Sequence, residues 1–279
     1  MSDNFTLAYN GKILSLSTPK IMGVININND SFYSGSRIQT ESALIDKAEK
    51  MLMDGAAIID IGVASSRPGA AKIDVATESA LIKQYLPKVR HHLKDSWISI
   101  DTYNSQTAEL ALDLGADMIN DISGGHIDIE MLKTINTRNC PFVAMHMRGT
   151  PDNMQSLINY DDIMLELIEY FNAIINQSNP LVQSNLVIDP GIGFAKSLDQ
   201  NYKIINDLST LKIINKPILI GISRKSLIYK FLEISIEDSL NGTSILNTIA
   251  LMKGANILRV HDVQEANQVI SLYNKVKNS

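Results

Sequence analysis

Eight short apolar runs recur along the 279-residue chain, and a longer segment with helical spacing of apolar residues follows each of them. Strands that alternate with helices in this way predict a parallel α/β sheet. The predicted strands cover residues 20–26, 57–62, 97–101, 117–121, 141–147, 185–189, 217–223 and 256–262. Eight units without a break in composition favour a single (β/α)8 TIM barrel, which needs about 250 residues. The alternative is an open doubly wound sheet, which usually has fewer strands.

The residues before the first predicted strand have a different pattern. Apolar and polar residues alternate on both sides of Asn10-Gly11, and this pair is typical of a tight β-hairpin turn. We therefore expect residues 1–19 to form an N-terminal hairpin that caps the bottom of the barrel, and residues 20–279 to form the barrel itself.

The composition narrows the class of protein. The net charge of −5 argues against a general nucleic-acid surface, which would be basic. No apolar run approaches the roughly 20 residues of a membrane span. Cys140 is the single cysteine, so an intrachain disulfide cannot form. The first residues lack the pattern of a secretory signal. We expect a cytoplasmic protein with neither a nucleic-acid nor a membrane partner.

Polar side chains gather where the predicted strands end. In a (β/α)8 barrel the carboxyl ends of the strands form one ring, and active sites lie there. The ring and the residues just after it contain Asn26, Ser66, Arg67, Asp101, Asn120, Asp189, Ser223, Lys225, Arg259 and His261. This predicts a ligand site at the mouth of the barrel.

The residue types in the ring indicate what it binds. Arg259 and His261 are two positions apart and so point to the same side of a strand. Together with the cationic side chains of Arg67 and Lys225 they could bind a phosphate, and Asn26 offers an oxygen to Mg²⁺. Buried carboxylates at Asp101 and Asp189 must either pair with cations or bind N–H donors such as those of an aminopyrimidine. The chain has neither a P-loop nor a dinucleotide-binding fingerprint.

Several segments together resemble one known family. They are IMGVININNDSF, GAAIIDIGVASSRPGA, ISIDTYNSQTAELALDLGADMINDISGG, VAMHMRGTP, VIDPGIGFAK, PILIGISRKS and ILRVHDV, and they cover nearly the whole chain. In this order they resemble the dihydropteroate synthases. That family consists of (β/α)8 barrel transferases, the targets of sulfonamides. They join 4-aminobenzoate to 6-hydroxymethyl-7,8-dihydropterin pyrophosphate and release pyrophosphate in folate biosynthesis.

The resemblance implies roles for individual residues. The pterin pocket would comprise Asp101, Asn120, Met145, Asp189, Lys225 and Arg259. The pyrophosphate and Mg²⁺ end would comprise Asn26, as the metal ligand, with Arg67, Arg259 and His261. The surroundings of 4-aminobenzoate would comprise Phe32, Ser66, Arg67, Pro68, Phe194, Ser223 and Lys225. Among these, Asp101, Asp189, Lys225 and Arg259 would carry the chemistry, a dissociative, SN1-like displacement. The resemblance also implies a homodimer.

The chain departs from the family pattern at a few positions. Asn28-Asn29 replaces Thr-Pro, residues 63–66 read Val-Ala-Ser-Ser in place of Gly-Glu-Ser-Thr, and Ile192 and Ala195 replace Phe and Gly. These changes concern the 4-aminobenzoate side. Two other functions stay open at this point. One is a related barrel that passes a methyl group from a folate to a corrinoid protein, and the other is a pterin-binding module without catalysis.

Overall fold

The computed structural model of the protein describes residues 5–27, 37–63 and 73–279. Eight parallel strands are hydrogen-bonded in the order β8-β7-β6-β5-β4-β3-β10-β9. A parallel bridge between Ile188 and Ile218 joins the two ends of this row, so the sheet closes on itself. The strands are β3 (Lys20–Asn26), β4 (Ile58–Gly62), β5 (Trp97–Asp101), β6 (Met118–Asp121), β7 (Phe142–Met145), β8 (Leu186–Asp189), β9 (Leu219–Ile220) and β10 (Ile257–Val260). The predicted barrel is confirmed and the open sheet is wrong.

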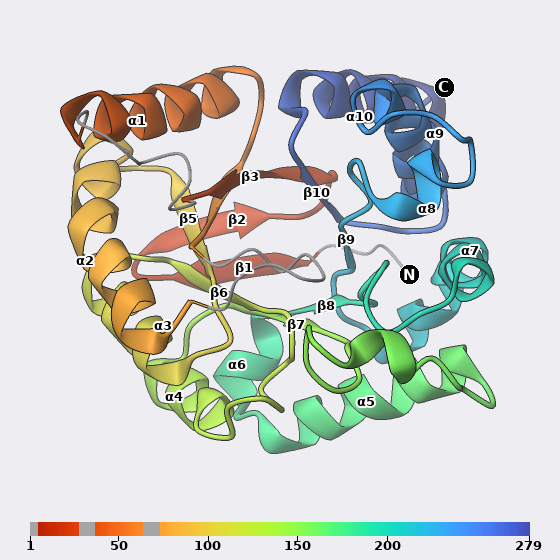
Figure 1. The fold of residues 1–279 in the computed structure, drawn as a ribbon, viewed down its shortest axis with the longest axis horizontal. Coiled ribbons are helices and arrows are strands. Elements are labelled where there is room, and N and C mark those ends of the chain that lie inside the picture. Colours follow the sequence, from red (N-terminus) through yellow and green to blue (C-terminus); the bar gives the residue numbers. More distant parts are fainter. Residues whose placement is uncertain (1–4, 28–36, 64–72) are drawn as a thin grey trace.

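Helices surround the barrel (Figure 1). They are α1 (Arg37–Met53), α2 (Val75–His92), α3 (Ser105–Asp113), α4 (Met131–Arg138), α5 (Ile163–Gln177), α6 (Pro180–Ser184), α7 (Leu198–Asn206), α8 (Ser226–Tyr229), α9 (Leu240–Met252) and α10 (Val263–Lys277), with 3-10 turns η2 (Met154–Ser156), η3 (Leu208–Ile214) and η4 (Glu237–Ser239). Capping side chains fix the first residues of several helices. The Asp162 side chain accepts from two amides at the start of α5, and Ser197 and Gln200 form a capping box at α7.

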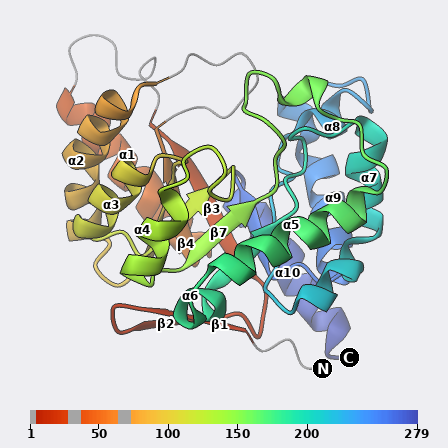
Figure 2. The ribbon, with the colours of Figure 1, turned by 90° about the horizontal axis from the view of Figure 1, so that it is seen from below.

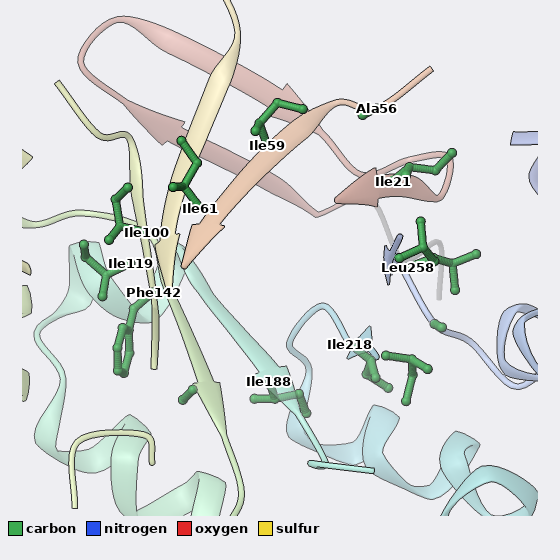
Figure 3. Close-up of a cluster of buried hydrophobic side chains, with 14 of the residues drawn as sticks. Ile21, Ala56, Ile59, Ile61, Ile100, Ile119, Phe142, Ile188, Ile218 and Leu258 are labelled. Carbon is green, nitrogen blue, oxygen red and sulfur yellow. The ribbon is translucent and has the colours of Figure 1, made fainter. Parts of the chain in front are cut away.

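The main core lies between the strands and the helices. Figure 3 shows part of it, with Ile59, Ile61 and Ile100 of the strands among the labelled side chains. Alternate residues of a strand point to opposite faces of the sheet. These three side chains therefore face the helices, and their neighbours in the strands face the barrel interior. The strands are therefore buried on both faces, as is usual for a parallel sheet.

The hairpin of β1 (Thr6–Tyr9) and β2 (Lys12–Ser15) closes the end of the barrel where the strands begin (Figure 2). Its Leu7 and Leu14, with the following Leu16, belong to one buried cluster with apolar residues from the beginning of the barrel strands, among them Trp97. The Lys12 ammonium also forms an ion pair with Asp117, 3.0 Å away. The expected hairpin cap is confirmed.

The interior changes character along the barrel axis. The inward-facing residues at the beginning of each strand are apolar, and the next ones include Asp60, Ser99, Asn120 and Arg259. Apolar side chains thus plug the bottom, and polar side chains occupy the upper layers, toward the mouth. None of the helices in the described part of the chain is long and apolar enough to cross a membrane.

Candidate active site

Arg259 of β10 lies between two carboxylates inside the barrel. Its Nε donates to Asp60 Oδ2 over 2.7 Å, and its Nη2 donates to Asp101 Oδ2 over 2.6 Å. The amide of Asn120 donates to the same Asp60 oxygen over 3.0 Å. Closure of the barrel brings these residues together, because β10 pairs with β3, and β3, β4, β5 and β6 follow in order. The result is a charged, hydrogen-bonded floor below the mouth.

The charges in this floor influence one another. Burial raises the pKa of Asp101 to about 7, the Arg259 guanidinium opposes that rise, and the carboxylate of Asp60 adds to it. Burial disfavours the charge on Arg259, but Asp60 and Asp101 outweigh it and raise the pKa of the guanidinium. Arg259 therefore stays cationic, and Asp101 titrates near neutral pH.

Asp189 and Lys225 are two further charged groups at the mouth, and each influences the charge of the other. Asp189 Oδ1 accepts from the amide of Gly191 over 2.8 Å, and burial raises its pKa while Lys225 opposes the rise. The Lys225 ammonium donates to the carbonyl oxygen of Ile192 over 2.6 Å and lies 4.7 Å from the centre of the Phe194 ring. Burial lowers the pKa of Lys225 to about 8, and the carboxylate of Asp189 opposes that fall.

An apolar wall stands beside these charges. Met145, Phe194, Ile122 and Ala195 belong to one buried cluster at the upper end of the barrel, separate from the main core. Met145 is opposite Asp189 in the register of β7 and β8. A flat heterocycle could therefore contact sulfur and ring atoms on one side while its edge reaches carboxylates.

Strand β9 is shorter than the predicted strand, which covered residues 217–223. The regular strand covers only Leu219–Ile220, and Arg224 has a left-handed backbone with φ of 53°. The Arg224 side chain turns away from the mouth and binds both carboxylate oxygens of Asp262, at 2.8 and 2.9 Å. This pair holds the turn between Ser223 and Lys225. Ser223 Oγ lies 3.1 Å from Nδ1 of His261, which brings together two residues that the sequence placed at the mouth.

Asn26 ends β3 at the same mouth. A Cβ atom at position 62 would lie 3.2 Å from Asn26 Oδ1 and 3.6 Å from Asp101 Oδ2, so Gly62 leaves room between these oxygens. Amide and carboxylate oxygens are the protein ligands that Mg²⁺ prefers, usually in small number beside phosphate oxygens. The donor set fits the predicted ion. The described residues contain no group of three or more histidine, cysteine or acidic side chains that could hold a metal by itself.

Four predicted site residues lie outside the described residues. They are Phe32, Ser66, Arg67 and Pro68. The other predicted positions all lie at or near the mouth: Asn26, Asp101, Asn120, Met145, Asp189, Phe194, Ser223, Lys225, Arg259 and His261.

The prediction did not include Asp60. It is fully buried, and one of its oxygens, Oδ1, has no hydrogen-bond partner among the described residues. The signal was present, because Asp60 interrupts an otherwise apolar strand, and strand alternation places it on the inner face with Ile58 and Gly62.

Comparison with known proteins agrees with this geometry. A sequence profile described as that of pterin binding enzymes matches residues 22–261. The dihydropteroate synthase of Synechocystis is 37% identical over 252 residues, which cover 89% of this chain and 87% of the relative. That of Escherichia coli is 36% identical over 260 residues, which cover 91% and 90%.

Solved structures of such enzymes have the same fold. The Yersinia pestis dihydropteroate synthase, solved with a sulfonamide drug complex, superposes with a TM-score of 0.89 at 32% identity and covers 99% of this chain and 100% of its own. The Xanthomonas albilineans enzyme, solved with 4-aminobenzoic acid, gives a TM-score of 0.90 at 29% identity, with 99% of both chains covered.

Proposed function

Because the chain belongs to the dihydropteroate synthase family of pterin-binding enzymes, we propose that it condenses 6-hydroxymethyl-7,8-dihydropterin pyrophosphate with 4-aminobenzoate. The products are 7,8-dihydropteroate, a folate precursor, and pyrophosphate. The observation that carries this proposal is the hydrogen-bonded set of Arg259, Asp60, Asp101 and Asn120 below the mouth, beside Asp189 and Lys225. A barrel that served only as a scaffold would need no such interior.

The pterin ring would be recognised along its polar edge and on its faces. Its ring and exocyclic N–H groups would donate to Asp101 and Asp189, and Asn120 and Lys225 would satisfy its other polar atoms. Met145 would contact one face of the ring, and Arg259 would stack on the other. A site built from buried hydrogen-bonding groups rejects a ligand that leaves them unpaired, so this set would make the pocket selective for an aminopyrimidine.

The pyrophosphate would lie further out, near Asn26, Arg259 and His261, with Arg67 as a further cation. Asn26 and the pyrophosphate oxygens would hold Mg²⁺, and the ion would neutralise charge on the leaving group. The cationic side chains would stabilise the negative charge that develops as the bond from the exocyclic methylene carbon to the pyrophosphate oxygen breaks and its electron pair leaves with that oxygen.

The methylene carbon would carry positive charge in a dissociative, SN1-like step. The carboxylates of Asp101 and Asp189 would favour that charge. The amine of 4-aminobenzoate is neutral at pH 7, so its lone pair would form the new C–N bond without a strong base, and its proton would leave to water or to pyrophosphate. Phe194, Ser223 and Lys225 would surround this second substrate, with Phe32, Ser66, Arg67 and Pro68 from the segments outside the described residues.

The test is pyrophosphate release by the purified protein with Mg²⁺ and the pterin substrate, with and without 4-aminobenzoate. We expect release that depends on 4-aminobenzoate and yields dihydropteroate. Asp189→Asn should lower kcat/KM by a factor that corresponds to a loss of about 2–4 kcal/mol of transition-state stabilisation, because it removes a negative charge from the site of the developing cation. Binding of the pterin substrate without turnover would refute the proposed synthase and leave a binding module. Transfer of a methyl group to a corrinoid acceptor would identify the other alternative.

We also propose that the protein is a homodimer. Helix α9 and the segment after α8 expose apolar side chains, with Ile245 51%, Met252 72% and Phe231 60% exposed. Large exposed apolar side chains on neighbouring elements are typical of a protein–protein interface. Sedimentation equilibrium should give twice the chain mass, and Ile245→Glu should shift the equilibrium to the monomer. A monomeric wild-type protein at micromolar concentration would refute this.

A further inference from the structure

The loop from residue 190 to residue 196, between β8 and α7, has an irregular backbone. Gly191, Gly193 and Ala195 all have positive φ, at 70°, 86° and 47°. Alternate left-handed residues cannot form a helix or a strand, so this loop depends on tertiary contacts for its shape. Its shape matters, because the carbonyl of Ile192 and the ring of Phe194 are both in contact with the Lys225 ammonium.

Lys196, at the end of this loop, is buried and points back into the protein. Its ammonium is within hydrogen-bond distance of three acceptors: the Phe194 carbonyl oxygen at 2.9 Å, the His146 carbonyl oxygen at 3.2 Å and His146 Nδ1 at 3.0 Å. One acceptor belongs to the loop and two belong to the residue that follows β7. The three N–H donors of Lys196 therefore connect the loop to the neighbouring strand.

The protonation state of His146 is consistent with these hydrogen bonds. Burial lowers the pKa of His146 to about 2, and the neighbouring Lys196 and Arg148 contribute. The imidazole is therefore neutral and can accept at Nδ1, with its proton on Nε2, which lies 3.7 Å from Glu166 Oε1. Arg148 in turn binds both oxygens of Glu166, at 2.8 and 2.7 Å. Glu166 of α5 is thus fixed beside the imidazole that accepts from Lys196.

A second observation shows how closely the loop approaches β7. The amide of His146 donates to the carbonyl oxygen of Asp189 over 2.9 Å, and a Cβ atom at position 191 would collide with the carbonyl oxygen of His146. Only glycine permits this approach. A buried ammonium loses its hydration, and burial lowers the pKa of Lys196 to about 7. An apolar residue would avoid this cost but could not bind three acceptors in the loop and the strand.

We propose that Lys196 is a positioning residue, which holds the 190–196 loop against the end of β7 and thereby keeps Ile192 and Phe194 where they orient the Lys225 ammonium toward the substrates. The part of this proposal that concerns substrates rests on the proposed synthase function. The geometric part concerns the loop alone and is open to a separate measurement.

The test is Lys196→Met in the full chain, with Lys216→Met as the matched control. Lys216 is a partly buried lysine whose ammonium likewise donates to a backbone carbonyl oxygen, that of Gln183, away from the mouth. We expect Lys196→Met to raise the KM for the substrates about tenfold or more, because displacement of an orienting group by about 1 Å has effects of that size or larger. The control should leave both KM values unchanged. A purely structural role would reduce the amount of active enzyme without changing KM.

A spectroscopic readout separates this proposal from the proposed function. The chain has six phenylalanines, and fluorine-labelled phenylalanine with Phe194→Leu as the assignment variant identifies the Phe194 signal. Lys196→Met should shift or broaden this signal, and Lys216→Met should not. Should Lys196→Met fail to fold, Lys196→Gln retains N–H donors without the charge and should give a smaller change in the same signal. An unchanged Phe194 signal in the folded Lys196 variant would overturn the proposal, whereas an inactive wild type would overturn only the synthase function.

Discussion

Asp60→Asn isolates the contribution of one buried charge to the floor of the site. An asparagine oxygen can still accept from Arg259 Nε and from the Asn120 amide, so the geometry is retained and the charge is lost. A hydrogen bond to a charged group contributes about 1–2 kcal/mol more than a neutral one. Because Arg259 keeps its second partner, Asp101, we expect kcat/KM for the pterin substrate to fall roughly five- to thirtyfold.

The same variant should change the pH dependence. The carboxylate of Asp60 contributes to the raised pKa of Asp101, so its removal should lower that pKa and move the acidic limb of the kcat/KM profile to lower pH. The assay is initial-rate pyrophosphate release from pH 5.5 to 9.5 with limiting pterin substrate. Ser99→Ala is the matched control, since Ser99 lies beside Asp60 in the same layer and its Oγ has no hydrogen-bond partner among the described residues. Wild-type kcat/KM and an unmoved acidic limb in Asp60→Asn would show that Asp101 alone positions Arg259.

Three further results are expected. In the wild type, kcat/KM for the pterin substrate should rise with pH through about 7 as Asp101 ionises, and fall above about 8 as Lys225 loses its proton. The Asp101→Asn variant should lack the acidic limb. A flat pH profile of the wild type would contradict these assignments. Arg224→Gln removes the bidentate pair with Asp262 and should raise the KM for the substrates about tenfold by releasing the turn that carries Lys225, whereas Lys230→Gln, on the same segment, should not. Asp117→Ala should lower the free energy of unfolding in urea by about 2–4 kcal/mol, because it leaves Lys12 and Arg90 without their buried partner at the barrel bottom. The kcat/KM of the folded enzyme should be unchanged, because the site lies at the other end of the barrel. A reduced kcat/KM in this variant would mean that the bottom and the mouth are coupled.

The alternation of strands and helices was sufficient to predict the barrel, because hydrophobic periodicity depends only on neighbouring residues and is visible in the sequence. The hairpin followed from Asn10-Gly11 for the same reason, since a turn of this kind is a local property; Asn10 and Gly11 indeed have positive φ, at 47° and 77°. The strand ends also indicated the mouth, because the carboxyl ends of parallel strands lie at one end of a barrel. Every predicted site residue in the described part of the chain lies in that region.

Which side chains pair with one another inside the mouth could not be predicted from local sequence patterns. Asp60 and Arg259 are separated by 199 positions, and Lys196 and His146 by 50. Strand alternation tells on which face each side chain lies, but the register between strands decides which side chains meet. The turn at Arg224 was missed because its left-handed backbone is stabilised by Asp262, which is 38 positions away.

The sequence by itself therefore determined the barrel, its hairpin cap, the position of the mouth and the chemical character of the groups around it, since each follows from local patterns. Only the tertiary structure decided that Arg259 is shared by Asp60 and Asp101, that Arg224 turns away from the site, and that Lys196 connects the 190–196 loop to β7. The physical reason is that closing the barrel brings distant strands together, and the charges buried there must find partners from whichever strands the register places beside them.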